Sequence, residues 1–178
     1  MTNAVGPIKF IAPKLIQSDW NEASVLGSTV WLWMNSDNHN ELPLHTLTVA
    51  LLPAIKRRQF ILGVQEDQPV FFLSWAELSV EAEHRYLENH QLRMFPEDWN
   101  SGDRFWFIDW VAPFGHTAEI YQILQKDLLK DLYARSLYHR ADERGRRIQH
   151  FFGSSFLPSE RSKLKLSVPK GVVNSNPL

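Results

Sequence analysis

The sequence predicts an α/β (α+β) fold in which helices flank one mixed central sheet. Its 178 residues suit one domain of ordinary size. Two pairs of short β-type runs, each separated by a polar turn, predict hairpins, and segments with helical features alternate with them. We therefore expect a single domain over residues 24–166, an N-terminal arm over residues 1–23, and a flexible tail over residues 167–178, which is rich in Pro, Ser and Asn.

Helices are predicted in five segments. Ser24 and Ser79 each precede a helical run and are of a residue type that caps helices. Glu81 and Glu83 fall in the first turn of the second run, where carboxylates favour the helix dipole. Residues 44–54 are so apolar that their pattern fits a helix or a strand, and we favour the helix. The five predicted helices are residues 24–34, 44–54, 79–89, 118–130 and 157–166.

Strands are predicted where β-branched and aromatic residues gather. Residues 59–64 and 69–75 flank the turn Glu-Asp-Gln, and residues 132–139 and 147–152 flank the polar segment 141–146. The most strand-like stretch is residues 103–113. Residues 35–43 are dense in turn formers and are predicted to be a loop.

Composition excludes several classes of function. The net charge of −1 provides no overall basic field for nucleic acid or an anionic membrane. The absence of cysteine excludes disulfides, thiolate zinc sites and a cysteine nucleophile. No apolar stretch approaches the length of a membrane span, and residues 1–23 lack the apolar run of a secretory signal. We therefore expect a cytoplasmic protein.

Sequence motifs for common cofactors are also missing. There is no GxxxxGK[ST], GxGxxG or GxSxG, and no glycine-rich turn of the kind that acetyl-CoA-dependent N-acetyltransferases use for pyrophosphate. His84 and His90 are six residues apart, and His39 and His45 have no carboxylate at a known ligand spacing. We therefore predict no metal site.

Asp109 and His39 are the residues best suited to acid–base chemistry. Strand alternation places Asp109 on one face with Phe107 and Val111, where a carboxylate is costly unless it is paired. It either orients a histidine or accepts a proton, or it is a structural acid bonded to loop amides or an arginine. His39 follows Ser36 by three residues in the predicted loop, and it is either an acid–base group or a solvated histidine.

Two basic clusters stand out against the near-zero net charge. Either they dock an acidic protein partner or they are ordinary solvated turns. Their members are Lys56, Arg57 and Arg58 in the first cluster and Arg144, Arg146 and Arg147 in the second.

Four stretches, in this order, carry a family resemblance. They are WLWMNSDNH (residues 31–39), LLPAIKRRQF (51–60), PVFFLSWAELS (69–79) and DWNSGDRFWFIDWVAPFG (98–115). Together they resemble the RTX toxin-activating lysine-acyltransferases, the haemolysin-activator family. The resemblance covers about residues 26–153.

The resemblance implies a fold, a reaction and a site. Such proteins have GNAT-like folds, hold no permanently bound cofactor, associate as homodimers, and take a fatty acyl chain from acyl-acyl carrier protein, where it is a phosphopantetheine thioester. They attach the chain to the ε-amino group of internal lysines of an RTX protoxin in the cytosol. The family's catalytic histidine falls on His39, its catalytic aspartate on Asp109, and the serine of its S-x-x-H motif on Ser36.

The chemistry of the reaction suits these residues. A lysine with a pKa of about 10.4 is a poor nucleophile at neutral pH, so a base must accept its proton. We assign this role to His39, with Asp109 orienting it and stabilising its cation or contacting the incoming lysine. Ser36, Asn35 or a backbone N–H can donate to the oxyanion. Direct attack is preferred because cysteine is absent, and an acyl-serine or acyl-histidine intermediate stays open.

The tryptophans allow two interpretations. Four of them can line an apolar groove for an acyl chain, although we favour plain core packing. They are Trp31, Trp33, Trp106 and Trp110. Two other functions are weighed against the acyltransferase: a non-catalytic escort for a secreted toxin, and a GNAT-type N-acetyltransferase that uses acyl-CoA.

Overall fold

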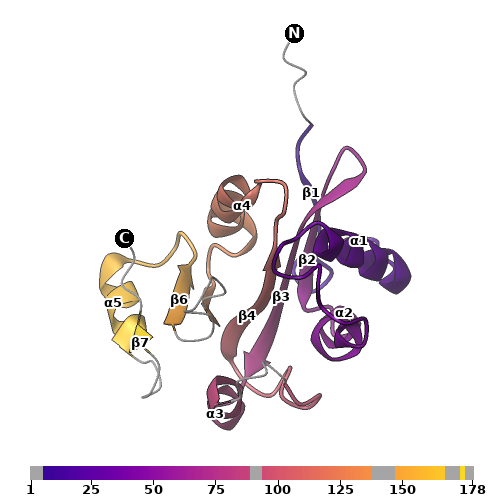
Figure 1. Ribbon diagram of the computed structural model, residues 1–178. Helices are drawn as coiled ribbons and strands as arrows, with labels where there is room; N and C mark the ends of the chain where they lie inside the picture. The colour runs from indigo at the N-terminus through magenta and orange to yellow at the C-terminus, as the bar shows by residue number, and fades with distance from the viewer. Residues whose placement is uncertain (1–5, 89–93, 138–146, 167–172, 175–178) are drawn as a thin grey trace. The chain divides into compact units, whose positions relative to one another are not determined.

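The chain forms two compact units. A computed structural model describes residues 6–88, 94–137, 147–166 and 173–174 (Figure 1). Unit 1 comprises Met1–Trp75 and Asp109–Ala118, and unit 2 comprises Ala76–Ile108 and Glu119–Leu178. Strands β3 (Gln68–Leu78) and β4 (Arg104–Val111) contribute residues to both units. No helix within the described ranges combines the length and the apolar character needed to cross a bilayer.

An antiparallel sheet and two helices build unit 1. Strand β1 (Lys9–Ile11), which lies in the segment predicted as an arm, pairs with β2 (Phe60–Gln65), and β2 pairs with β3. The predicted β2–β3 hairpin is confirmed. Its turn places Glu66 and Asp67 at φ values of 49° and 64°, a left-handed conformation that aspartate tolerates better than most residues.

Helix α1 (Glu22–Met34) confirms the predicted helix but not its cap. We expected Ser24 to begin the helix. Instead Asn21 has extended backbone, and its side chain accepts a hydrogen bond from the Ser24 backbone N–H at 3.1 Å. The helix therefore begins earlier, because asparagine caps at least as well as serine and lies one turn upstream.

The apolar segment around residues 44–54 is helical, as we favoured. It contains a π-helical turn, η1 (Leu47–Leu51), followed by α2 (Leu52–Lys56). Figure 1 shows α2 beside α1. Together they cover the sheet of unit 1 with a core of buried side chains from α1, η1, α2 and the strands: Val25, Leu32, Trp33, Leu51, Ile55, Phe60, Leu62, Phe72 and Val111.

Unit 2 has a mixed sheet. Strand β4 pairs in parallel with β5 (Tyr133–Leu137), β5 pairs antiparallel with β6 (Arg147–Phe152), and β6 pairs in parallel with β7 (Val173–Asn174). The predicted β5–β6 pairing and the predicted strand at β4 are confirmed, while the connection at 141–146 lies outside the described residues. The α/β class with a mixed sheet is thus confirmed, and it is consistent with a GNAT-like fold.

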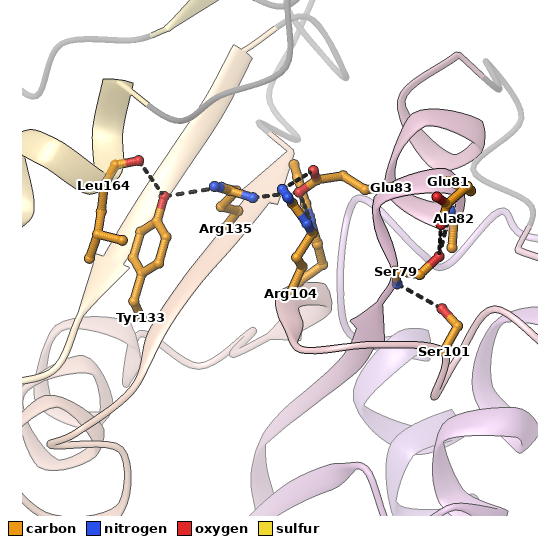
Figure 2. Close-up of polar contacts among 10 residues, drawn as sticks. Ser79, Glu81, Ala82, Glu83, Ser101, Arg104, Tyr133, Arg135 and Leu164 are labelled. Atoms are coloured by element: carbon orange, nitrogen blue, oxygen red, sulfur yellow. Dashed lines mark hydrogen bonds and ion pairs between the residues drawn. The ribbon is translucent and has the colours of Figure 1, made fainter.

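The remaining helices also match the predicted segments. They are α3 (Val80–Glu88), α4 (Thr117–Ile123), which continues into the π-helical turn η2 (Leu124–Leu128), and α5 (Pro158–Leu166). Ser79 caps α3 as expected, because its hydroxyl accepts a hydrogen bond from the Ala82 backbone N–H at 3.2 Å (Figure 2). The Tyr133 hydroxyl lies 3.3 Å from the Leu164 carbonyl and ties α5 to β5.

A buried carboxylate connects α3 to the strands of unit 2. Glu83 is fully buried, and its Oε1 accepts hydrogen bonds from Arg135 Nη1 and, at 2.8 Å, from Trp106 Nε1. Its Oε2 accepts from Arg104 Nη1 at 2.7 Å, as Figure 2 shows. Glu83 lies in the first turn of α3, as predicted. It also accepts hydrogen bonds from three donors, two of them cationic, which is what makes its burial tolerable.

Candidate active site

The turn after α1 joins Ser36 to His39. The helix ends at Met34, and the predicted loop is a series of turns in which the His39 backbone N–H bonds the Ser36 carbonyl at 2.9 Å. This turn brings the two side chains together, so that Ser36 Oγ lies 2.8 Å from His39 Nδ1. The three-residue spacing of the S-x-x-H motif therefore places the serine and histidine side chains side by side across one backbone turn.

Strand β4 brings Asp109 to the other side of the imidazole. Asp109 Oδ1 lies 3.0 Å from His39 Nε2, and their side chains are only 13% and 14% exposed. Asp109 Oδ2 accepts a hydrogen bond from Trp33 Nε1 at 2.9 Å. All four residues lie in unit 1. Trp33, Asp109, His39 and Ser36 thus form one continuous hydrogen-bonded chain.

The hydrogen bonds assign a role to each imidazole nitrogen. An ionised carboxylate only accepts, so Asp109 requires the hydrogen of His39 to lie on Nε2. The lone pair then lies on Nδ1 and accepts the hydroxyl hydrogen of Ser36. In this tautomer His39 can take up a proton at Nδ1, and the neighbouring carboxylate stabilises the resulting imidazolium.

Trp33 also contacts His39 directly. The two rings lie 5.0 Å apart between centroids, with 30° between their planes. Trp33 is 6% exposed and belongs to the core of unit 1. This tryptophan therefore has the core packing that we favoured over an acyl groove. Its bond to Asp109 was missed, although a buried indole N–H calls for an acceptor and Asp109 was identified as a carboxylate in need of partners.

The other predicted site residues have different surroundings. Asn35 Nδ2 donates to the Trp31 carbonyl at 2.8 Å, within its own helix end. Trp31 is 39% exposed, and its ring lies 5.3 Å from that of Phe114. Trp110 packs edge-on against Phe71 at 4.9 Å. Trp31 is therefore the most exposed of the tryptophans proposed for an acyl groove.

Trp106 has a core position in unit 2. It is fully buried, it donates to Glu83, and its ring packs edge-on against Tyr86 at 5.5 Å. These contacts match the core packing that we favoured for the tryptophans.

The first basic cluster lies at the end of α2. Lys56 and Arg58 are exposed, and the Arg58 guanidinium lies 5.9 Å from the ring of Trp20. Arg57 Nη1 donates to the Pro53 carbonyl at 3.3 Å. Of the second cluster, Arg147 begins β6, whereas Arg144 and Arg146 lie outside the described residues.

Known proteins match this chain over the region that contains the site. A family model described as the RTX toxin acyltransferase family matches residues 18–152, which contain the whole hydrogen-bonded chain. The leukotoxin-activating lysine-acyltransferase LtxC of Aggregatibacter actinomycetemcomitans is 41% identical over 133 residues, 75% of this chain and 78% of that protein. The RTX-I toxin-activating lysine-acyltransferase ApxIC of Actinobacillus pleuropneumoniae is 38% identical over 144 residues, 81% and 83% of the two chains.

A third relative is named for its acyl group. The protein-lysine myristoyltransferase RtxC of Kingella kingae is 39% identical over 130 residues, 73% of this chain and 77% of that protein. The match of the family model over most of the chain, together with relatives at this level of identity, establishes the kinship that the motifs indicated. The chain belongs to the RTX toxin acyltransferase family.

Proposed function

We propose that this protein transfers a fatty acyl group from acyl-acyl carrier protein to the ε-amino group of internal lysines of an RTX protoxin in the cytoplasm. Its membership of the RTX toxin acyltransferase family supports the reaction class. The observation that carries the assignment of residues is the hydrogen-bonded series Ser36–His39–Asp109. It provides a base with a fixed tautomer beside a carboxylate, which an amine nucleophile requires.

The reaction begins when the lysine amine replaces the Ser36 hydroxyl as the hydrogen-bond partner of His39 Nδ1. As the amine nitrogen forms a bond to the thioester carbonyl carbon, His39 takes its proton and Asp109 stabilises the imidazolium. The displaced Ser36 hydroxyl, or the Asn35 amide, donates to the oxyanion. Collapse of this intermediate breaks the C–S bond, and His39 returns the proton to the departing phosphopantetheine thiolate.

Two kinds of surface bind the acyl-acyl carrier protein: basic residues bind the carrier protein, and apolar residues bind its acyl chain. Carrier proteins that present acidic helices fit the exposed cations of Lys56 and Arg58, with Arg57 beside them. Arg144, Arg146 and Arg147 form the second proposed docking cluster. The acyl chain then requires an apolar path, for which Trp31 and Trp110 are the proposed residues, because Trp33 and Trp106 are buried in the core. Association as a homodimer is part of the same proposal.

The experiment is co-expression of the chain with a candidate RTX protoxin, followed by intact-mass and peptide mass spectrometry of the protoxin. We expect acyl mass on specific lysines, lost with His39→Ala and strongly reduced with Asp109→Asn. Because a relative is named a myristoyltransferase, a myristoyl donor is the first to supply in the purified reaction. Both acyl-acyl carrier protein and acyl-CoA are supplied in parallel, since turnover with acyl-CoA alone indicates the N-acetyltransferase class.

The His39→Ala protein also separates an enzyme from an escort. An escort retains its effect on the toxin without the imidazole, whereas an acyltransferase loses it. Absence of added mass with a folded wild-type chain and its cognate protoxin contradicts the proposed function. Circular dichroism of each variant shows that the fold is retained.

A further inference from the structure

We infer that Trp33 is a positioning residue of this site: its indole N–H fixes the Asp109 carboxylate, and its ring supports the His39 imidazole. The inference rests on the proposed roles of His39 and Asp109. Trp33 touches neither the lysine nor the thioester in the proposed reaction. It acts through the two residues that do the chemistry.

With the Trp33 hydrogen bond in place, both oxygens of the Asp109 carboxylate are held by donors. A lone contact from His39 to Oδ1 leaves the carboxyl group free to turn about its Cβ–Cγ bond. The bond from Trp33 Nε1 to Oδ2, at 2.9 Å, removes that freedom, while Oδ1 remains 3.0 Å from His39 Nε2. The plane of the carboxylate is thereby set by donors from α1 and from the turn that follows it.

The ring of Trp33 contacts His39, the hydrogen-bond partner of Asp109. The indole and imidazole centroids are 5.0 Å apart with planes inclined by 30°, so the imidazole packs on the indole π system. A cation near an aromatic face is attracted by the ring quadrupole, so the contact favours the imidazolium that forms when His39 accepts a proton. One side chain therefore orients the carboxylate and supports the base.

Packing and positioning must be separated, because Trp33 is also a core residue. The buried face of α1 consists of Val25, Thr29, Leu32 and Trp33, and only Trp33 of these donates to Asp109. Trp33→Phe keeps an aromatic ring and removes the N–H donor. Substitution of Trp33 by benzothienylalanine, in which sulfur replaces the N–H, retains the whole bicyclic shape.

The experiment compares these two proteins with the wild type in the purified acyl-transfer reaction. We expect kcat to fall about 10- to 100-fold in both, with KM for the acyl donor unchanged, because the base is misaligned while donor binding is intact. The control is Trp75→Phe, which removes a buried indole from β3 and should leave kcat unchanged. In an Asp109→Asn background, Trp33→Phe should have no further effect on kcat, because the lost N–H acts through that carboxylate and phenylalanine keeps a ring beside His39.

A spectroscopic measurement is independent of turnover. The indole N–H resonance of Trp33, assigned by its loss in Trp33→Phe, should move on Asp109→Asn substitution, because an indole bonded to a carboxylate is deshielded. Wild-type kcat in both Trp33 proteins, or an equal loss in the Asp109→Asn background, overturns the inference. If the wild-type protein itself transfers no acyl group, the proposed function fails, and the resonance still reports whether the bond exists.

Discussion

The Ser36 hydroxyl covers His39 Nδ1 at 2.8 Å, the nitrogen that Asp109 leaves with a lone pair. The proposed base, whose side chain is 14% exposed, therefore does not face open solvent in the resting protein. Any acceptor lysine must displace a hydroxyl that comes from the same turn as the base itself. This arrangement gives Ser36 two successive partners during the proposed reaction, the imidazole first and the oxyanion afterwards.

Ser36→Ala should lower the rate of acyl transfer by about 10²-fold without unfolding the protein, since one donor to the developing oxyanion is lost. Ser36→Thr retains the hydroxyl and serves as the matched control, with a smaller loss expected. Initial rates in the purified reaction measure both. An alanine protein as active as the wild type would show that the hydroxyl has no part in the reaction.

Glu83→Gln should destabilise the protein by about 3 kcal/mol or more, because it leaves the guanidinium of Arg135, a buried residue, without its counter-charge. Urea unfolding followed by fluorescence measures the loss. Glu88→Gln, at the exposed end of the same helix, is the control and should be close to neutral. Equal midpoints for the two variants would contradict the role given to the buried cluster.

Glu81 should make the stability of the protein depend on acid pH. Its backbone hydrogen bond, and then the bond from the Ser79 hydroxyl at 2.9 Å, lower the pKa of its carboxyl below the usual 4.5. A depressed pKa in the folded state adds stability above the ordinary value, and this stability is lost as pH falls through the folded value.

The difference in unfolding free energy between wild type and Glu81→Gln should therefore shrink as pH is lowered from about 7 to about 3. Ser79→Ala removes one cause of the shift. It also removes the cap of α3, which costs about 1 kcal/mol at all pH values. A difference that stays constant across this range would show that Glu81 has no such linkage.

Gly102→Ala should be strongly destabilising. An added Cβ would lie 2.5 Å from the Leu78 carbonyl oxygen and 2.6 Å from Ser79 Cα, where backbone cannot yield easily. Gly27→Ala in α1 is the matched control, since a Cβ there meets nothing within 4 Å. It should stabilise the protein by about 0.5–1 kcal/mol through helix propensity. Thermal unfolding of both variants tests the contrast, and similar melting temperatures would refute it.

The sequence predicted the elements well where the signal was local. The hairpin of β2 and β3 follows from two β-type runs around a polar turn, and the cap of α3 follows from Ser79. The cap of α1 was misplaced because Asn21 and Ser24 are both good caps, and composition alone does not choose between them. The π-helical turns η1 and η2 have no compositional signature that separates them from α-helix.

Contacts between side chains far apart in the sequence could not be predicted from local patterns. Glu83 resembles any first-turn acid until Arg135, 52 residues away, is placed beside it. Trp33 resembles a core tryptophan until Asp109, 76 residues away, accepts its N–H. His39 and Asp109 were singled out as candidate acid–base residues from their chemistry, and the family motifs added Ser36 and indicated the catalytic roles. Their contact follows from a turn that sets the Ser36–His39 spacing and from β4, which brings Asp109 from a distant part of the sequence.

The sequence positions of the four hydrogen-bonded residues determine the order in which the site is assembled. Trp33, Ser36 and His39 come from one short stretch, whereas Asp109 is separated from His39 by 70 positions. A growing chain that has not yet produced β4 holds an imidazole without its counter-ion, and closing so long a loop comes later than folding a helix and a turn. Closure of this hydrogen-bonded chain is therefore a late event in synthesis and folding, and it requires both sequence segments of unit 1 to be in place.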